Sequence, residues 1–200
     1  MELAPLYLKK HEERRLRNGH LWVYSNEVDI GRSPLSDFTA GQQVSLIAND
    51  GKPLGNGYVN PHSLICSRLV SRSPKYVLDK SLLVHRLKIA LSLRERLFEK
   101  PFYRLVYGES DALPGLVVDR FGDVLVVQLN TAGMEAVKGE VLEALLGAVA
   151  GAQLLPAVVH LGDGLLLERS DLEEARDLVG GEVAVLVDPV AADVQLVRAR

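Results

Sequence analysis

Apolar and polar residues alternate in short stretches through the first third of the chain, which is the pattern of β-strands. Turn residues separate these stretches at intervals of about ten residues, as in a small all-β module. Between them, residues 10–18 are rich in helix-forming charged residues and stop at Gly19, so they predict a short helix. The predicted strands are residues 6–8, 20–28, 42–48 and 63–70.

After the basic, proline-containing connector at residues 71–75, the period becomes helical, and residues 76–98 predict the longest helix. On a helical wheel Arg86 and Arg94 fall within the apolar arc, whereas Arg96 lies on the polar arc. An arginine on an inner face requires a carboxylate. The predicted apolar stripe consists of Leu83, Leu87, Ala90, Leu93 and Leu97.

The rest of the chain predicts strands on both sides of a second amphipathic helix at residues 133–150. We therefore predict an α+β fold, in which a β-β-α-β-β domain occupies residues 73–185 and residues 186–200 form a tail. A helical turn is predicted at residues 171–176. The predicted strands are residues 103–111, 116–119, 124–129, 156–161 and 165–168, with the second and third paired as a hairpin.

Two carboxylates follow the long helix closely. Glu109 and Asp111 are two residues apart, which on a strand places them on one side. That spacing suits acid–base catalysis, but carboxylates beside an arginine-bearing helix more often form a structural ion pair. We favour a pair of Arg94 with Glu109 or Asp111.

Other signatures of catalysis and metal binding do not occur. The sequence contains no G-x-G-x-x-G, Walker A, H-E-x-x-H or G-x-S-x-G motif, and the five histidines lack the spacing of metal ligands. Cys66 lies in a predicted strand, where burial is favoured over a catalytic role. No apolar run reaches the length of a membrane span, and the charged N-terminus has no signal peptide, so we expect a cytoplasmic protein.

The charge distribution indicates a polyanionic partner for the first half of the chain. Residues 1–100 carry 16 Lys and Arg against 10 Asp and Glu, whereas residues 101–200 carry 7 against 16. Cations followed along the chain by aromatic residues suit RNA, although Glu12 and Glu13 also allow an ordinary solvated helix. The candidate RNA-binding residues are Lys9, Lys10, Arg14, Arg15, Arg17, Tyr24 and Arg68.

Three segments carry a family resemblance: LYLKKHEERRLRNGHLWVYSNEV, GKPLGNGYVNPHSLICSRLVS and GESDALPGLVVDRFGDVLVVQ. Over residues 6–135 the chain resembles bacterial S-adenosylmethionine-dependent large-subunit rRNA (cytosine-C5) methyltransferases. The resemblance implies a PUA domain, a small β-barrel, over residues 1–72. It also implies the intermediate domain that follows, and a Rossmann-like methyltransferase domain after both.

The motifs of that third domain do not occur in this chain, which ends in EVAVLVDPVAADVQLVRAR. We therefore expect no catalytic residue and no S-adenosylmethionine site here, although the family uses that cofactor, and enzymatic activity stays open. The expected function is recognition of large-subunit rRNA. The alternative is a stand-alone RNA-binding or protein-interaction module, and self-association stays open.

Overall fold

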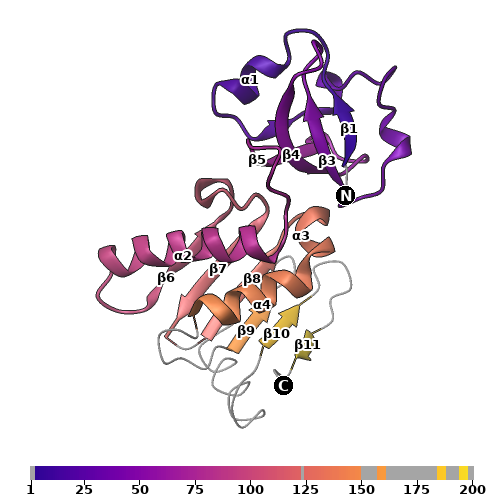
Figure 1. The fold of residues 1–200 in the computed structure, drawn as a ribbon. Coiled ribbons are helices and arrows are strands. Elements are labelled where there is room, and N and C mark those ends of the chain that lie inside the picture. The colour runs from indigo at the N-terminus through magenta and orange to yellow at the C-terminus, as the bar shows by residue number, and fades with distance from the viewer. Residues whose placement is uncertain (1–2, 123, 150–156, 161–183, 188–193, 198–200) are drawn as a thin grey trace. The chain divides into compact units, whose positions relative to one another are not determined.

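The computed structural model describes residues 3–122, 124–149, 157–160, 184–187 and 194–197. The chain divides into two compact units (Figure 1). The first comprises Met1–Leu82 and Thr131–Lys138, and the second comprises Leu83–Asn130 and Gly139–Arg200. The prediction of a mixed fold with helices and sheets is confirmed. No helix in the described part of the chain is both long and apolar enough to cross a membrane.

The first unit contains a five-stranded sheet in which only the β1–β3 pair is parallel. An antiparallel bridge between Leu8 and Val28 joins the segments that follow the two edge strands, β1 and β2. This bridge draws the two edges of the sheet together. In spatial order the strands are β1 (Ala4–Tyr7), β3 (Gln43–Ile47), β4 (Pro53–Val59), β5 (Ser67–Ser71) and β2 (Trp22–Val23).

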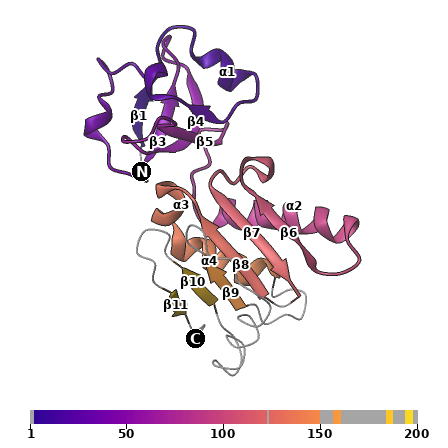
Figure 2. The same cartoon turned by 180° about the vertical axis from the view of Figure 1, so that it is seen from behind.

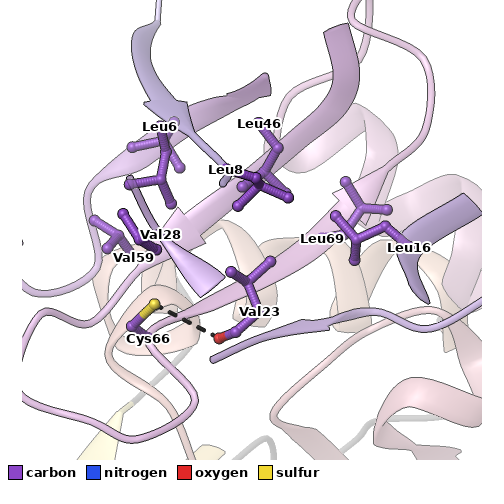
Figure 3. Packing of buried hydrophobic residues seen from close by; sticks show 10 residues of the cluster. Leu6, Leu8, Leu16, Val23, Val28, Leu46, Val59, Cys66 and Leu69 are labelled. Carbon is purple, nitrogen blue, oxygen red and sulfur yellow. Dashed lines mark hydrogen bonds between the residues drawn. The ribbon is translucent and has the colours of Figure 1, made fainter. Parts of the chain in front are cut away.

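The inner face of this sheet carries the core of the first unit, shown in Figure 3. Along β1 and β3 the side chains alternate as the sequence predicts: Leu6 and Leu46 are fully buried, whereas Tyr7, Ser45 and Ile47 face outward and are half-buried. The helix α1 (Glu13–Arg17) adds one buried side chain. The other members of the core cluster are Leu8, Leu16, Val23, Val28, Val44, Val59, Cys66 and Leu69.

Two predicted elements of this unit are shorter than expected. The helix predicted over residues 10–18 begins only at Glu13, because His11 has a φ of 76°, which is incompatible with a helix. The strand predicted over residues 20–28 ends at Val23. It gives way to the 3₁₀ turn η1 (Ser25–Glu27), in which the Glu27 carboxylate accepts the backbone N–H of Tyr24 at 2.7 Å.

The second unit contains a sheet with six described strands in the order β11-β10-β9-β8-β7-β6. The pairs β6–β7, β7–β8 and β10–β11 are antiparallel, and β8, β9 and β10 run parallel. The strands are β6 (Phe102–Tyr107), β7 (Leu116–Phe121), β8 (Val124–Leu129), β9 (Ala157–His160), β10 (Ala184–Val187) and β11 (Val194–Val197).

Two helices cover one face of this sheet, as Figures 1 and 2 show from opposite sides. The predicted helix over residues 76–98 is confirmed as α2 (Lys80–Leu97). The one predicted over residues 133–150 is divided at Val137 into α3 (Ala132–Ala136), which belongs to the first unit, and α4 (Lys138–Val149). At the break, Val137 has φ −114° and ψ 24°. The α4 positions predicted to be apolar and buried, Val141, Leu145 and Val149, are buried.

The inner stripe of α2 differs from the predicted one at its C-terminal end. Leu83, Leu87 and Ala90 are buried as expected, but Leu93 and Leu97 are 47% and 67% exposed. A stripe with 3.6 residues per turn that passes through positions 83, 87 and 90 continues to position 94, where the inner residue is an arginine. The apolar residues at 93 and 97 therefore lie beside the buried stripe.

The C-terminal part of the chain also departs from the prediction. The hairpin of residues 116–119 and 124–129 is confirmed as β7 and β8, but the sheet continues past the tail predicted from residue 186. Strand β10 includes residue 186, and β11 pairs with β10 in antiparallel register. The predicted strand at residues 165–168 and the turn at residues 171–176 lie outside the described residues.

Candidate nucleic-acid interface

The basic segment around α1 presents exposed cations that include Lys10, Arg14 and Arg17. Arg14 lies 3.5 Å from the Nδ1 atom of His11, and Arg17 is 3.6 Å from Glu13 one turn earlier in the helix. Both contacts are long and both arginines are exposed, so the contacts hold these side chains weakly. The guanidinium groups are available to a polyanion.

Lys9, which is also exposed, and Arg15 make shorter hydrogen bonds to the protein. The Nζ atom of Lys9 donates a 2.8 Å hydrogen bond to the Asn26 carbonyl. Arg15 donates at 2.7 Å to the buried carboxylate of Glu27, and this bond raises the pKa of Arg15 above its ordinary value. Arg15 therefore stays partly solvated, with its side chain 39% exposed, but its guanidinium already has a carboxylate partner. No signal in the sequence showed that Glu27 would be buried.

The aromatic candidates have different surroundings. Tyr24 is half-buried, and the Arg15 guanidinium lies 4.9 Å from its ring centroid, so this ring is already stacked. Trp22 is 37% exposed on β2, where it pairs in register with Arg68 of β5. Directly opposed residues of an antiparallel pair project to the same face of the sheet. Trp22 and Arg68 therefore place an exposed ring beside a half-buried guanidinium.

Arg72 was missed by the sequence reasoning, although it positions α1. Its guanidinium donates to the backbone carbonyl of Leu16 and, at 3.3 Å, to that of His20. Carbonyls at the end of a helix lack partners within the helix, and a cation suits that end. Arg72 thus fixes the end of the segment that carries the exposed cations.

In the second unit, Arg94 lies against Asp111. Two hydrogen bonds of 2.6 and 2.7 Å join the guanidinium to the carboxylate, and the two side chains are 13% and 8% exposed. Arg94 also donates to the Arg104 carbonyl at 3.1 Å, and Asp111 accepts the backbone N–H of Tyr107 at 2.7 Å. This arrangement is a hydrogen-bonded structural support.

The strand predicted over residues 103–111 ends at Tyr107. Glu109 and Asp111 lie in the 3₁₀ turn η3 (Gly108–Asp111), so the expectation that they share one side of a strand is wrong. Gly108 begins this turn with a φ of 51°, and Ala112 ends it with a φ of 57°; neither value is compatible with a strand.

Cys66 is fully buried, and its thiol donates to the Val23 carbonyl at 3.6 Å (Figure 3). Burial raises the pKa of Cys66 to about 12. Since the thiolate is the reactive form, we expect the folded protein not to react with a disulfide reagent at pH 8. The absorbance of the thiolate that the reagent releases on reaction with Cys66 should appear only after the protein is unfolded in urea. Equal rates with and without urea would contradict this assignment.

Among the described residues, no group of three or more His, Cys, Asp and Glu could hold a metal ion. We also find no described turn that fits S-adenosylmethionine. Such a site requires a glycine-rich turn between a strand and a helix. Between β8 and α3 the turn is Asn130-Thr131, and the Thr131 hydroxyl accepts the Met134 N–H as an ordinary helix cap.

Comparison with known families decides the nature of the first unit. Residues 6–72 match the model of a PUA-like domain. They are a PUA-like domain. This range contains β2 to β5 and the second half of β1, and it lies within the domain that the resemblance implied over residues 1–72. The exposed cations Lys10, Arg14 and Arg17 all lie within it.

Two curated relatives extend the similarity beyond this domain. The chain is 37% identical over 146 residues to "Ribosomal RNA large subunit methyltransferase I" of Aliivibrio fischeri (strain MJ11), a match that covers 70% of the chain and 36% of the relative. It is 32% identical over 190 residues to the protein of the same name from Escherichia coli O139:H28, covering 92% and 46%. The chain thus spans less than half the length of these homologous proteins.

Solved structures share the fold. A candidate S-adenosylmethionine-dependent methyltransferase from Streptococcus mutans aligns with a TM-score of 0.66 at 15% identity, covering 94% of this chain and 46% of that one. A candidate methyltransferase complexed with SAH aligns with the same TM-score at 17% identity, covering 79% and 40%. The sequence resemblance is strongest over residues 6–135, and the similarity of fold continues past residue 135.

Proposed function

We propose that this chain recognises large-subunit rRNA through its PUA-like domain, as the RNA-binding region of an S-adenosylmethionine-dependent rRNA (cytosine-C5) methyltransferase. The observation that carries the proposal is the cluster of exposed cations Lys10, Arg14 and Arg17 within residues 6–72. The name of the curated relatives supports rRNA as the target. No described residue is assigned to the methyl transfer.

The exposed cations account for sequence-independent affinity. Each guanidinium or ammonium that neutralises a phosphate releases a condensed counterion, so binding weakens steeply as salt rises. Trp22, opposite Arg68 on the same face of the sheet, provides a ring on which an unpaired base can stack. Phosphate contacts therefore position the RNA, and stacking favours its single-stranded parts.

A double charge reversal tests the proposal. Arg14→Glu with Arg17→Glu should weaken binding to every rRNA fragment alike, and the slope of log K against log salt should become less steep by about two contacts. Fluorescence anisotropy of labelled fragments at several salt concentrations measures both quantities. Arg15 is excluded from this variant, because a glutamate there would face the buried carboxylate of Glu27.

The matched control is Lys88→Glu with Arg96→Glu, which makes the same change of charge at two exposed positions of α2 in the second unit. This control should bind RNA with nearly the affinity of the unmodified protein. If both double variants lose the same affinity, the effect arises from net charge, and the α1 surface is not the RNA site. If the unmodified protein binds no rRNA fragment at low salt, the proposal is wrong.

A further inference from the structure

We propose that the PUA-like domain binds one unpaired nucleotide of the RNA in a groove on the outer face of its sheet. The groove has a volume of about 380 Å³ and is lined by residues of β1, β3 and β4 and by Pro74 and Val77 of the segment after β5. This inference rests on the proposed RNA binding. It adds a second contact, distinct from the cations of α1, that selects single-stranded RNA.

The floor of the groove follows from the register of β1 and β3. Pro5 pairs with Ser45 and Tyr7 pairs with Ile47, so these four side chains share the outer face of the sheet. The intervening residue Leu6 points into the core. The side chains of Tyr7, Pro5 and Ile47 thus form a largely apolar surface around the Ser45 hydroxyl group.

The wall of the groove is fixed by two buried or half-buried amides. The Nδ2 atom of Asn56, a residue only 2% exposed, donates to the carbonyls of Pro74 at 3.0 Å and Tyr76 at 2.9 Å. Gln43 binds the backbone of Leu78 with both its amide nitrogen and its amide oxygen, each at 2.8 Å. The segment is therefore held in place before any ligand binds, which reduces the entropic cost of binding.

A cation lies against Tyr7, one of the residues that line the groove, and it could bind a nucleotide phosphate. The Arg32 guanidinium stacks on the Tyr7 ring, 3.5 Å from its centroid, and donates to the Asn49 carbonyl at 3.3 Å. These two contacts orient an otherwise exposed side chain, and a guanidinium with five N–H groups retains donors for phosphate. Lys75 is exposed in the segment that forms the wall and adds a second positive charge.

The combination favours a nucleotide over other small ligands. The apolar side chains Pro5 and Ile47 and the part of the Tyr7 ring that Arg32 leaves uncovered suit the face of a base. The Ser45 hydroxyl can either donate to or accept from the edge of the base, and Arg32 suits its phosphate. The volume lies at the lower end of the range of ligand pockets, about 300–1,000 Å³. A base within a duplex has both faces and its pairing edge covered, so only an unpaired base can enter.

The test compares a labelled single-stranded hexauridylate with an RNA duplex of the same length. Ser45→Phe fills the groove from an outward-facing position and leaves the core intact. It should weaken binding of the hexamer about tenfold, the effect of losing one stacked base, and leave duplex binding unchanged. Ser36→Phe is the control, because Ser36 is exposed and does not line the groove. A hexamer with 4-thiouridine should crosslink to the peptide that contains Tyr7.

The outcomes separate this inference from the proposed function. Unchanged hexamer affinity in a folded Ser45→Phe variant, or crosslinks only outside the groove, overturns the groove assignment while rRNA binding that depends on Arg14 and Arg17 persists. Arg32→Ala is an independent test, because this substitution removes the cation without filling the groove. This variant should also bind the hexamer more weakly. Absence of binding by either RNA to the unmodified protein overturns both proposals.

Discussion

Arg94→Ala is expected to destabilise the second unit by about 3–5 kcal/mol, the usual cost of removing one partner of a buried ion pair. Without the guanidinium, the Asp111 carboxylate, 8% exposed, keeps only uncharged partners such as the Tyr107 N–H. The Arg104 carbonyl also loses a donor. The loss should therefore be concentrated around β6 and η3, which the Arg94 side chain joins to α2.

The control for this prediction is Arg96→Ala on the exposed side of the same helix, which should change stability by less than about 0.5 kcal/mol. Trp22, the only tryptophan, lies in the first unit, so tryptophan fluorescence does not report on this change. Hydrogen exchange of peptides from β6 and β7 does, and these amides should exchange faster in Arg94→Ala alone. Equal and small effects of both variants would refute a structural role for Arg94.

Helical periodicity was sufficient to place Arg94 on the inner side of α2, because a single helix obeys one geometric rule along its length. The same rule failed for Leu93 and Leu97, since the continuation of the buried stripe depends on which residues the sheet presents beneath it. Helical periodicity also could not predict the turn that begins at Gly108. Short strands could be predicted where apolar and polar residues alternate regularly, as in β1 and β3. The end of β2 could not be predicted, because it depends on the turn in which Glu27 is buried.

The groove and the ion pair between Arg15 and Glu27 could not be predicted from the sequence, for a physical reason. Both depend on contacts between segments far apart in the chain: Arg15 meets Glu27 through the turn after β2, and Asn56 meets Pro74 across the end of β5. Composition and spacing show which residue types are present, but not which polar groups become buried together. The sequence therefore shows where the basic residues lie, but it does not show that Lys9 and Arg15 already have hydrogen-bond partners within the protein.

Gly55→Ala is expected to destabilise the PUA-like domain by about 3 kcal/mol or more, because two penalties coincide at this position. The φ of Gly55 is +134°, which side chains rarely adopt, and a Cβ atom there would lie 2.0 Å from the Ser71 carbonyl oxygen and 2.8 Å from the Cα of Arg72. Backbone atoms of a neighbouring strand cannot rotate away. The chain has to separate β4 from the end of β5, which would also disturb Arg72 and the groove wall.

A matched variant isolates the steric part of this effect. Gly51 also has a positive φ, +84°, but a Cβ atom added there meets nothing within 4 Å, so Gly51→Ala carries the conformational penalty alone, about 1 kcal/mol. Urea unfolding followed by the fluorescence of Trp22 is suited to both variants, because β2 pairs with β5, the strand that the methyl group added at position 55 would displace. Gly55→Ala should shift the midpoint much further than Gly51→Ala. Equal midpoints would mean that β4 and β5 separate without loss of stability, and that the close approach of the two strands does not hold this domain together.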